Sequence, residues 1–526
     1  MNDSSLLLLA PEVTLVAGAS LVLLIGLARQ EAVRASSFLL AFLTALAALA
    51  IAWAAGPLER PIRAFGVELT SLTWYVRLTA LGIGLVVLLV HHHIPQEEQR
   101  GEIFSMILFS LTGIMLTTMA DDLVLLFLAV ELVSVPTYIL VSMGRSDIRA
   151  QEAGFKYFFL GALAAALLAY GLSFLYGASG DTCLSRMNLD GNHAYVIIGM
   201  LLAFSGIAFK IAAVPFHAYA ADVYQGSASP TAGLLGFFPK LAGFVALIKL
   251  LMLVQPRGTG PLGWEIPDIG FAFLWIAAVA TMIVGNALAL LQTNVKRILA
   301  YSSVAHSGYM LVAVLAGPVA GGGPLRNGLS AMLFYVTVYG LMNLGAFAVL
   351  SVTRADGREV EELDDLAGLS RCHPSAAFAL AVCVFSLMGL PPTAGFLGKL
   401  YIFSSALSVD PSHPHRLALI ALAVIGVINA AIAAAYYLRI VAACYLRPPR
   451  YRFALVTRSR PLQFGVFCCC LAVLLIGLWP APLIRMSSQP FLELRPPSML
   501  AKNSPFPQPP SRRQAIKHDT AGPHRR

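Results

Sequence analysis

Long apolar runs separated by short polar connections extend along the chain from residue 5 to residue 484. A helix needs roughly 20 mostly apolar residues to cross a bilayer, and about 14 runs are suitable. The pattern therefore predicts an all-α, polytopic membrane protein of about 14 transmembrane helices. The predicted spans are 5–28, 36–55, 72–91, 103–120, 122–144, 155–177, 193–216, 228–254, 270–291, 299–317, 327–352, 375–405, 416–446 and 463–484.

Helix-breaking residues interrupt two of these runs. In GIAFKIAAVPFHAYAADVYQGSASP, Pro215 follows Lys210, and in FSLMGLPPTAGFLGKLYIF, Pro391 and Pro392 precede Lys399. Proline frees a backbone carbonyl, which in a membrane needs a partner from protein or water. A kinked packing helix would explain one such break. Two breaks, each near a lysine, instead predict two inverted five-helix repeats, spans 4–8 and 9–13, with equivalent broken helices 7 and 12.

This interpretation divides the chain into five parts. Residues 1–100 form an N-terminal three-helix segment, 101–255 the first inverted repeat, and 256–446 the second. The first repeat would be the input half of an ion path and the second the output half. Residues 447–485 carry the last span, and 486–526 form a basic, Pro-rich tail that we expect to be disordered.

Composition supports a membrane protein and excludes several other classes. The chain is 58% hydrophobic and 12% charged, whereas soluble domains carry about 25% charged residues. The net charge of +9 is attributed to topology and not to nucleic acid, because basic residues mark cytoplasmic loops. Seven cysteines without a CxxC pair indicate no metal site and no redox centre in this chain. No nucleotide-binding motif is present.

Basic residues also predict the orientation. With the N-terminus on the periplasmic side, the odd-numbered connections are cytoplasmic and hold more Lys and Arg, including Lys296. The even-numbered connections hold fewer, with Arg77 among them. The acidic loop at 354–374 is interpreted as a solvated helical face and not as a metal site.

Five ionisable residues lie inside the apolar runs: Glu131, Lys156, Lys210, Lys240 and Lys399. A charge near the bilayer centre costs about 2.5–3.5 kcal/mol on insertion scales, so such residues usually serve a function. Together they indicate a proton path, in which Glu131 would pair with a lysine on another helix. The alternative for Glu131 is a carboxylate satisfied by a neighbouring serine or by backbone.

Some of these positions have a simpler structural explanation. Lys240 and Lys156 lie near span ends, where a lysine can extend its ammonium to the membrane interface. His217 and His306 lie in or beside polar stretches, where a proton-relay role competes with that of a hydrogen-bonded core histidine.

Several stretches resemble the proton-antiporter-like membrane subunits of respiratory complex I, most closely subunit N of bacterial NADH:quinone oxidoreductase, the counterpart of mitochondrial subunit 2. They are ELVSVPTYIL, KYFFLGALAAALLAYGLSFLYG, FKIAAVPFHAYAADVYQG, NVKRILAYSSVAHSGYML and GLPPTAGFLGKLYIF, within residues 100–445. DVYQG and the KYF segment favour subunit N over its two larger paralogues. The sequence departs from the family pattern at Tyr219, Ala221 and Ser307, where Trp, Pro and Leu are usual.

The resemblance implies a role for each site residue. Glu131 would pair with Lys210, Lys240 would be the central connecting lysine and Lys399 the lysine of the exit side. Lys156, His217 and His306 would be accessory. It further implies a bacterial inner-membrane location and other membrane-arm subunits as partners, including the paralogous antiporter-like ones. NADH, FMN, iron–sulfur clusters and quinone would belong to partner subunits.

The resulting expectation is a proton-translocating subunit driven by redox chemistry in its partners. Two alternatives remain. One is a subunit of a multi-subunit cation/proton antiporter or a membrane-bound hydrogenase. The other is a membrane-arm scaffold that does not pump.

Overall fold

The computed structural model describes residues 9–492 apart from 59–60, 65, 94–98, 145–146, 190–192, 254–265, 319–323, 356–357, 451–452 and 456–458. The predicted tail beyond residue 492 therefore lies outside the described residues. The described helices are α2 Ala10–Gly26, α3 Glu31–Ala35, α4 Ser37–Ala55, α5 Ser71–His91, α6 Arg100–Met119, α7 Leu123–Met143, α8 Ile148–Ser179, α9 His193–Lys210, α10 Ala220–Gly226, α11 Ser229–Leu235, α12 Phe238–Leu253, α13 Asp268–Leu290, α14 Val295–Ala316, α15 Gly328–Val352, α16 Leu369–Cys372, α17 Pro374–Met388, α18 Ala394–Leu407, α19 Arg416–Leu446, α20 Arg460–Leu478 and α21 Ala481–Leu492, with a 3₁₀ turn at Leu363–Leu366. The short strands are β1 Ile62–Ala64, β2 Val67–Leu69, β3 Thr353–Ala355, β4 Arg358–Glu359 and β5 Phe453–Leu455.

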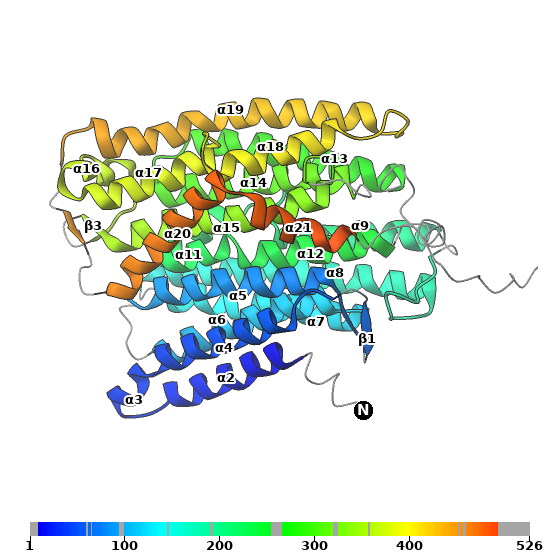
Figure 1. Ribbon diagram of the computed structural model, residues 1–526, viewed down its shortest axis with the longest axis horizontal. Helices are drawn as coiled ribbons and strands as arrows, with labels where there is room; N and C mark the ends of the chain where they lie inside the picture. The colour runs from blue at the N-terminus through cyan, green and yellow to red at the C-terminus, as the bar shows by residue number, and fades with distance from the viewer. Residues whose placement is uncertain are drawn as a thin grey trace, which may run out of the picture.

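The all-helical membrane fold is confirmed. Among the described residues, 12 helices are long and apolar enough to cross a membrane, and α2, α17 and α18 are shorter apolar helices. Most of the long helices lie side by side along one direction (Figure 1). The hairpin β1–β2 lies near one end of the bundle, and β3 and α16 lie at the other (Figure 1). The described chain begins at α2 and finishes at α21 near the same end, as an even number of crossings requires.

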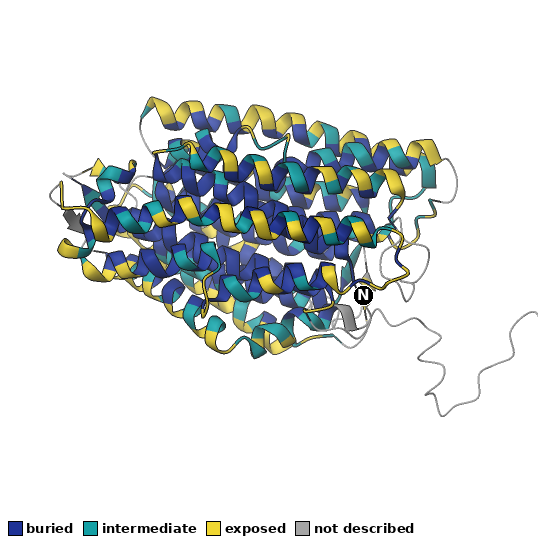
Figure 2. Cartoon of the chain, turned by 90° about the horizontal axis from the view of Figure 1, so that it is seen from above, coloured by how far each residue is buried: buried dark blue, intermediate teal, exposed yellow. Residues whose placement is uncertain are grey.

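Burial sorts the helices into an interior and a rim. α14 and α15 are buried along almost their whole length, as is the segment Ser229–Leu253, which contains α11 and α12. α4, α8, α19 and α20 are less buried and carry exposed apolar side chains. Figure 2 shows that exposed residues lie on the outer helices of the bundle and buried residues in its interior. In a membrane these outward faces contact lipid, so polar side chains become informative when they occur in the interior.

The turn between α6 and α7 follows from its two aspartates. The Asp122 carboxylate accepts hydrogen bonds from the backbone N–H groups of Val124 and Leu125 at 2.8 and 3.1 Å, and so caps α7. The Asp121 carboxylate accepts from the backbone N–H of Ser185, at 3.0 Å, in the loop between α8 and α9. The tight turn between α6 and α7 is therefore fixed by two carboxylates, one that caps α7 and one that binds a neighbouring loop.

The two predicted helix breaks are confirmed. α9 ends at Lys210 and α10 begins at Ala220, while α17 ends at Met388 and α18 begins at Ala394. Because the breaks lie five crossings apart, helices that traverse the membrane alternately run through them in opposite directions, as inverted repeats require. A further break, between α11 and α12, was not predicted.

Three sequence interpretations are corrected. Arg77 and Lys296, both counted among the connections, lie within α5 and α14 and are buried. Lys296 falls outside the predicted span 299–317 because hydropathy windows exclude charged residues near span ends, whereas Arg77 already falls inside the predicted span 72–91 and does not belong to a connection. The acidic loop is not a helical face: it contains β3, β4 and the 3₁₀ turn, and β3 also pairs with β5. The last span also differs from prediction, because it breaks after Leu478 and continues obliquely as α21 (Figure 1).

Candidate functional site

The first ionisable group joins α9 to α7. The Lys210 ammonium lies 2.9 Å from Glu131 Oε1, 2.7 Å from Ser134 Oγ and 3.2 Å from the Tyr138 hydroxyl. The Lys210 side chain is 3% exposed and that of Glu131 18%. Glu131, Ser134 and Tyr138 lie three and four residues apart, so they share one face of α7. This spacing is a signal for the lysine-binding face that the sequence interpretation missed.

The second group is Lys240, which is 1% exposed. Its ammonium donates to the Ser303 carbonyl oxygen and to Ser307 Oγ, the latter at 2.8 Å, and lies 5.1 Å from the centre of the Tyr339 ring. Both hydrogen-bond partners are in α14. Although Lys240 is in the first turn of α12, it points into the bundle and does not reach the membrane interface.

α12 also packs directly against Lys210 and Ile211. Gly243, one turn after Lys240, has no side chain, and a Cβ there would lie 2.7 Å from Ile211 Cγ2 and 3.2 Å from Lys210 Cβ. The helix that carries Lys240 therefore packs closely against the end of the helix that carries Lys210. The two lysines belong to one packed cluster.

His306, which is 1% exposed, lies on the far side of Lys240's partners in α14. Its Nδ1 is 2.5 Å from the Tyr335 hydroxyl and its Nε2 is 2.9 Å from the Tyr437 hydroxyl, while Tyr437 is also bonded to Ser302. Both ring nitrogens thus have a hydroxyl partner that can donate or accept a proton. This is also the environment of a satisfied core histidine.

Lys399 is 5% exposed and lies at the break between α17 and α18. Its ammonium donates to the carbonyl oxygens of Leu387 and Met388, both at 2.9 Å, and lies 5.3 Å from the centre of the Tyr309 ring. Tyr309 is one turn beyond His306 in α14. The third lysine is therefore held by backbone dipoles and an aromatic face.

Helix α14 carries His306 and contacts both Lys240 and Lys399. Ser303 and Ser307 of α14 face Lys240, whereas Ser302, His306 and Tyr309 face the tyrosines and Lys399 of the second half. The polar residues repeat at helical spacing in YSSVAHSGY. α14 thus joins the buried groups of the two halves.

The two remaining predicted residues are not in this buried row. Lys156 is 41% exposed and pairs with Glu152 at 2.8 Å and with Asp222 at 2.9 Å; Arg297 contacts the same Asp222 at 2.7 Å. His217 is half-buried in the segment between α9 and α10. These residues belong to the rim of the first half.

Two buried ion pairs were not anticipated. The Lys296 side chain is fully buried, with its ammonium 3.0 Å from Glu359 Oε2 and 3.1 Å from the Ser227 carbonyl oxygen. Arg77 binds both oxygens of Glu12 at 2.8 Å, which ties α5 to α2. Both pairs hold segments of the chain together: Lys296 joins α14 to β4 and to the residues before α11, and Arg77 joins α5 to α2.

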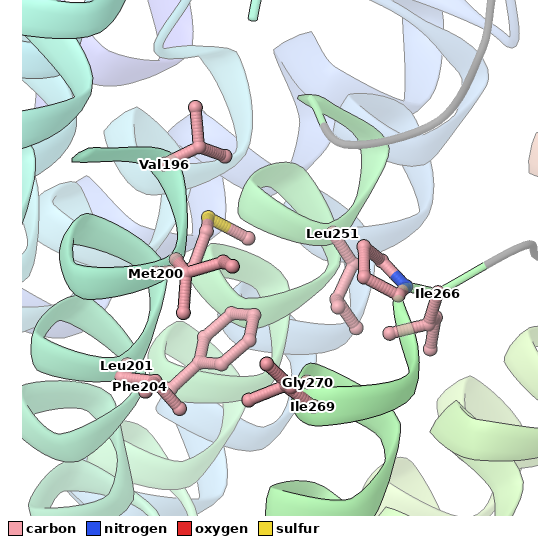
Figure 3. Close-up of a pocket in the computed structure, with 10 residues that line it drawn as sticks. Val196, Met200, Leu201, Phe204, Leu251, Ile266, Ile269 and Gly270 are labelled. Atoms are coloured by element: carbon pink, nitrogen blue, oxygen red, sulfur yellow. The ribbon is translucent and has the colours of Figure 1, made fainter. Parts of the chain in front are cut away.

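An apolar pocket lies between α9, α12 and α13 (Figure 3). Its lining includes Val196, Met200, Phe204, Leu251 and Ile266. Its described lining residues carry no charge and include none of the lysines of the row. Among the described residues, no group of three or more His, Cys, Asp or Glu side chains could hold a metal ion.

Comparison with known proteins places this arrangement in a family. Residues 120–431 match the family described as NADH:quinone oxidoreductase/Mrp antiporter, transmembrane. NADH-quinone oxidoreductase subunit N of Trichlorobacter lovleyi is 38% identical over 416 residues, covering 78% of this chain and 81% of that protein. The subunit N of Myxococcus xanthus is 35% identical over 516 residues, covering 91% and 96%.

A solved structure agrees. A chain of respiratory complex I from Thermus thermophilus superposes with a TM-score of 0.73 and 28% identity, covering 90% of this chain and 98% of that one. These matches confirm the resemblance drawn from the sequence motifs. The chain belongs to the NADH:quinone oxidoreductase/Mrp antiporter family of membrane proteins, and within it to the subunit N proteins of NADH-quinone oxidoreductase.

Proposed function

We propose that this chain translocates protons across the membrane as an antiporter-like subunit of NADH:quinone oxidoreductase, driven by redox chemistry in partner subunits. The observation that carries the proposal is the set of three buried lysines, Lys210, Lys240 and Lys399. They are joined by packing at Gly243 and by the polar residues of α14. Buried ammonium groups are costly, and three of them linked through neighbouring residues favour a proton relay over a packing role.

The chemistry begins at the ion pair. With Glu131 at 2.9 Å, Lys210 is favoured in its charged form, because an adjacent carboxylate stabilises the ammonium. Separation of the pair would leave a desolvated ammonium and favour release of its proton towards Lys240. The Ser303 and Ser307 groups hold Lys240 at the next position. His306 and its tyrosine partners lie between this position and Lys399, from which the proton would leave.

The remaining expectations form part of the same proposal. Protons would move from the cytoplasm to the periplasm, with the N-terminus on the periplasmic side. Other membrane-arm subunits would be the partners, and NADH, FMN, iron–sulfur clusters and quinone would act outside this chain. Lys156 and His217, at the rim of the first half, would assist proton uptake.

The test is proton pumping by reconstituted complex carrying Lys210→Ala or Glu131→Ala, with assembly verified. We expect each variant to lose coupled pumping and most quinone reductase activity. A scaffold that does not pump predicts unchanged activity for both. Lys249→Ala is the control: Lys249 is a half-buried lysine that donates to the Ala120 carbonyl oxygen, at 2.9 Å, outside the row.

A further inference from the structure

The backbone groups freed by the break after α9 have partners from the second half of the protein. In a continuous helix the Ile211 carbonyl would accept from the N–H of residue 215, but Pro215 has none. The Ser307 hydroxyl of α14 donates to this carbonyl oxygen instead, at 2.5 Å. Nearby, the Val214 N–H donates to Thr281 Oγ1 of α13, at 2.9 Å. Hydroxyls of α13 and α14 therefore form hydrogen bonds with backbone groups that the break leaves without helical partners.

Ser307 also binds Lys240. A serine hydroxyl has one hydrogen to donate and two lone pairs to accept with. Because the hydrogen points to Ile211, the lone pairs are available to the Lys240 ammonium at 2.8 Å. The residue is 0% exposed, so water does not compete for these contacts. One hydroxyl thus fixes Lys240 relative to the backbone that directly follows Lys210.

We propose that Ser307 is a positioning residue for Lys240, holding its ammonium against the break that follows Lys210 so that displacement of Lys210 is transmitted to Lys240. The inference rests on the proposed function, because transmission matters only if both lysines carry the same proton. Ser307 does not itself relay the proton, since the Ile211 carbonyl that it faces cannot pass one on.

The experiment compares Ser307→Ala, Ser307→Thr and Ser405→Ala in assembled, reconstituted complex. Ser405 is a matched control: it is also 0% exposed, and its hydroxyl donates to the Ile402 carbonyl oxygen of its own helix. We expect Ser307→Ala to lower the pumping rate about tenfold, the scale of one lost hydrogen bond to a charged group. Ser307→Thr, which keeps the hydroxyl, should recover most of the rate, and Ser405→Ala should match the unmodified complex.

Hydrogen exchange of the segment 211–219 supplies a second measurement that is independent of pumping. Ser307→Ala should accelerate exchange there, and Ser405→Ala should not.

Unchanged pumping in Ser307→Ala, equal impairment in Ser405→Ala, or failure of Ser307→Thr to recover would overturn the proposal. Lys210→Ala, run in parallel, separates the two hypotheses: if it abolishes pumping while Ser307→Ala does not, only the role of Ser307 is rejected. If neither impairs pumping, both fail.

Discussion

The Lys399 ammonium lies 2.9 Å from the carbonyl oxygen of Met388, which would bond the N–H of residue 392 if that residue were not proline. In a continuous helix the Leu387 carbonyl would bond the N–H of residue 391, but Pro391 has none. This carbonyl also accepts a hydrogen bond from Lys399, at 2.9 Å. The proline pair therefore creates the acceptors that hold the lysine. The break and the buried charge form one structural unit.

Substitutions of Lys399 separate its contribution to the stability of the break from its contribution to proton transfer. Lys399→Ala leaves two buried carbonyls without a donor, at a cost of about 1–3 kcal/mol each, and should lower both stability and pumping. Lys399→Arg retains a donor but cannot release a proton, so we expect normal assembly with loss of pumping. Thermal unfolding and proton pumping of reconstituted complex measure the two effects. Pumping by Lys399→Arg at the normal rate would remove Lys399 from the relay.

The Lys210–Glu131 pair permits a similar separation. Lys210→Met alone leaves a carboxylate without its cation, and breaking a buried pair in this way costs about 3–5 kcal/mol, less here because Glu131 is 18% exposed. Adding Glu131→Gln removes the uncompensated charge, so the double variant should reverse most of the decrease in melting temperature that Lys210→Met causes. Neither variant should pump. Recovery of pumping in the double variant would contradict the relay.

The last span packs directly on the break before Lys399. Gly477 lies at the end of α20, and a Cβ there would come within 2.1 Å of the Pro392 carbonyl oxygen. Because backbone cannot yield as a side chain can, Gly477→Ala should displace the last span at a cost of about 1–3 kcal/mol. We expect a lower melting temperature and slower pumping.

Gly82→Ala is the matched control for this prediction. A Cβ at Gly82, within α5, meets no atom within 4 Å, so alanine should be neutral or should stabilise the helix by up to about 1 kcal/mol. If the two substitutions change the melting temperature and pumping equally, the packing explanation for Gly477 is wrong.

The acidic loop is held by pairs of different strength. Lys296 is fully buried, and Lys296→Ala should destabilise the protein by about 3 kcal/mol, at the lower end for a buried pair because Glu359 is 21% exposed. Arg149 is 65% exposed and lies 3.6 Å from Glu361 of the same loop, so Arg149→Ala should cost less than about 1 kcal/mol. Thermal unfolding of both variants tests the contrast, and equal losses would refute it.

Much of the fold could be predicted because membrane spans depend on local properties. The length of each apolar run and the position of Pro215, Pro391 and Pro392 located the helices and both breaks. The prediction failed where a charge lies near a span end. Lys296 interrupts the hydropathy pattern at the start of its span, and both Lys296 and Arg77 are buried because each has a carboxylate partner distant in sequence.

The site could be predicted only in part. The burial of Lys210, Lys240 and Lys399 followed from their apolar surroundings, but their partners depend on which helices pack together. That α14 supplies both contacts of Lys240 is a tertiary relationship without a local signal. The face formed by Glu131, Ser134 and Tyr138 is different, since its helical spacing was readable and was overlooked.

The position of α14 has a mechanical consequence. Ser307 contacts one half of the protein and His306, its neighbour in sequence, contacts the other, and both are fixed to the same rigid backbone. Turning this helix about its own axis would alter both sets of contacts simultaneously. The two halves therefore cannot be adjusted independently through α14.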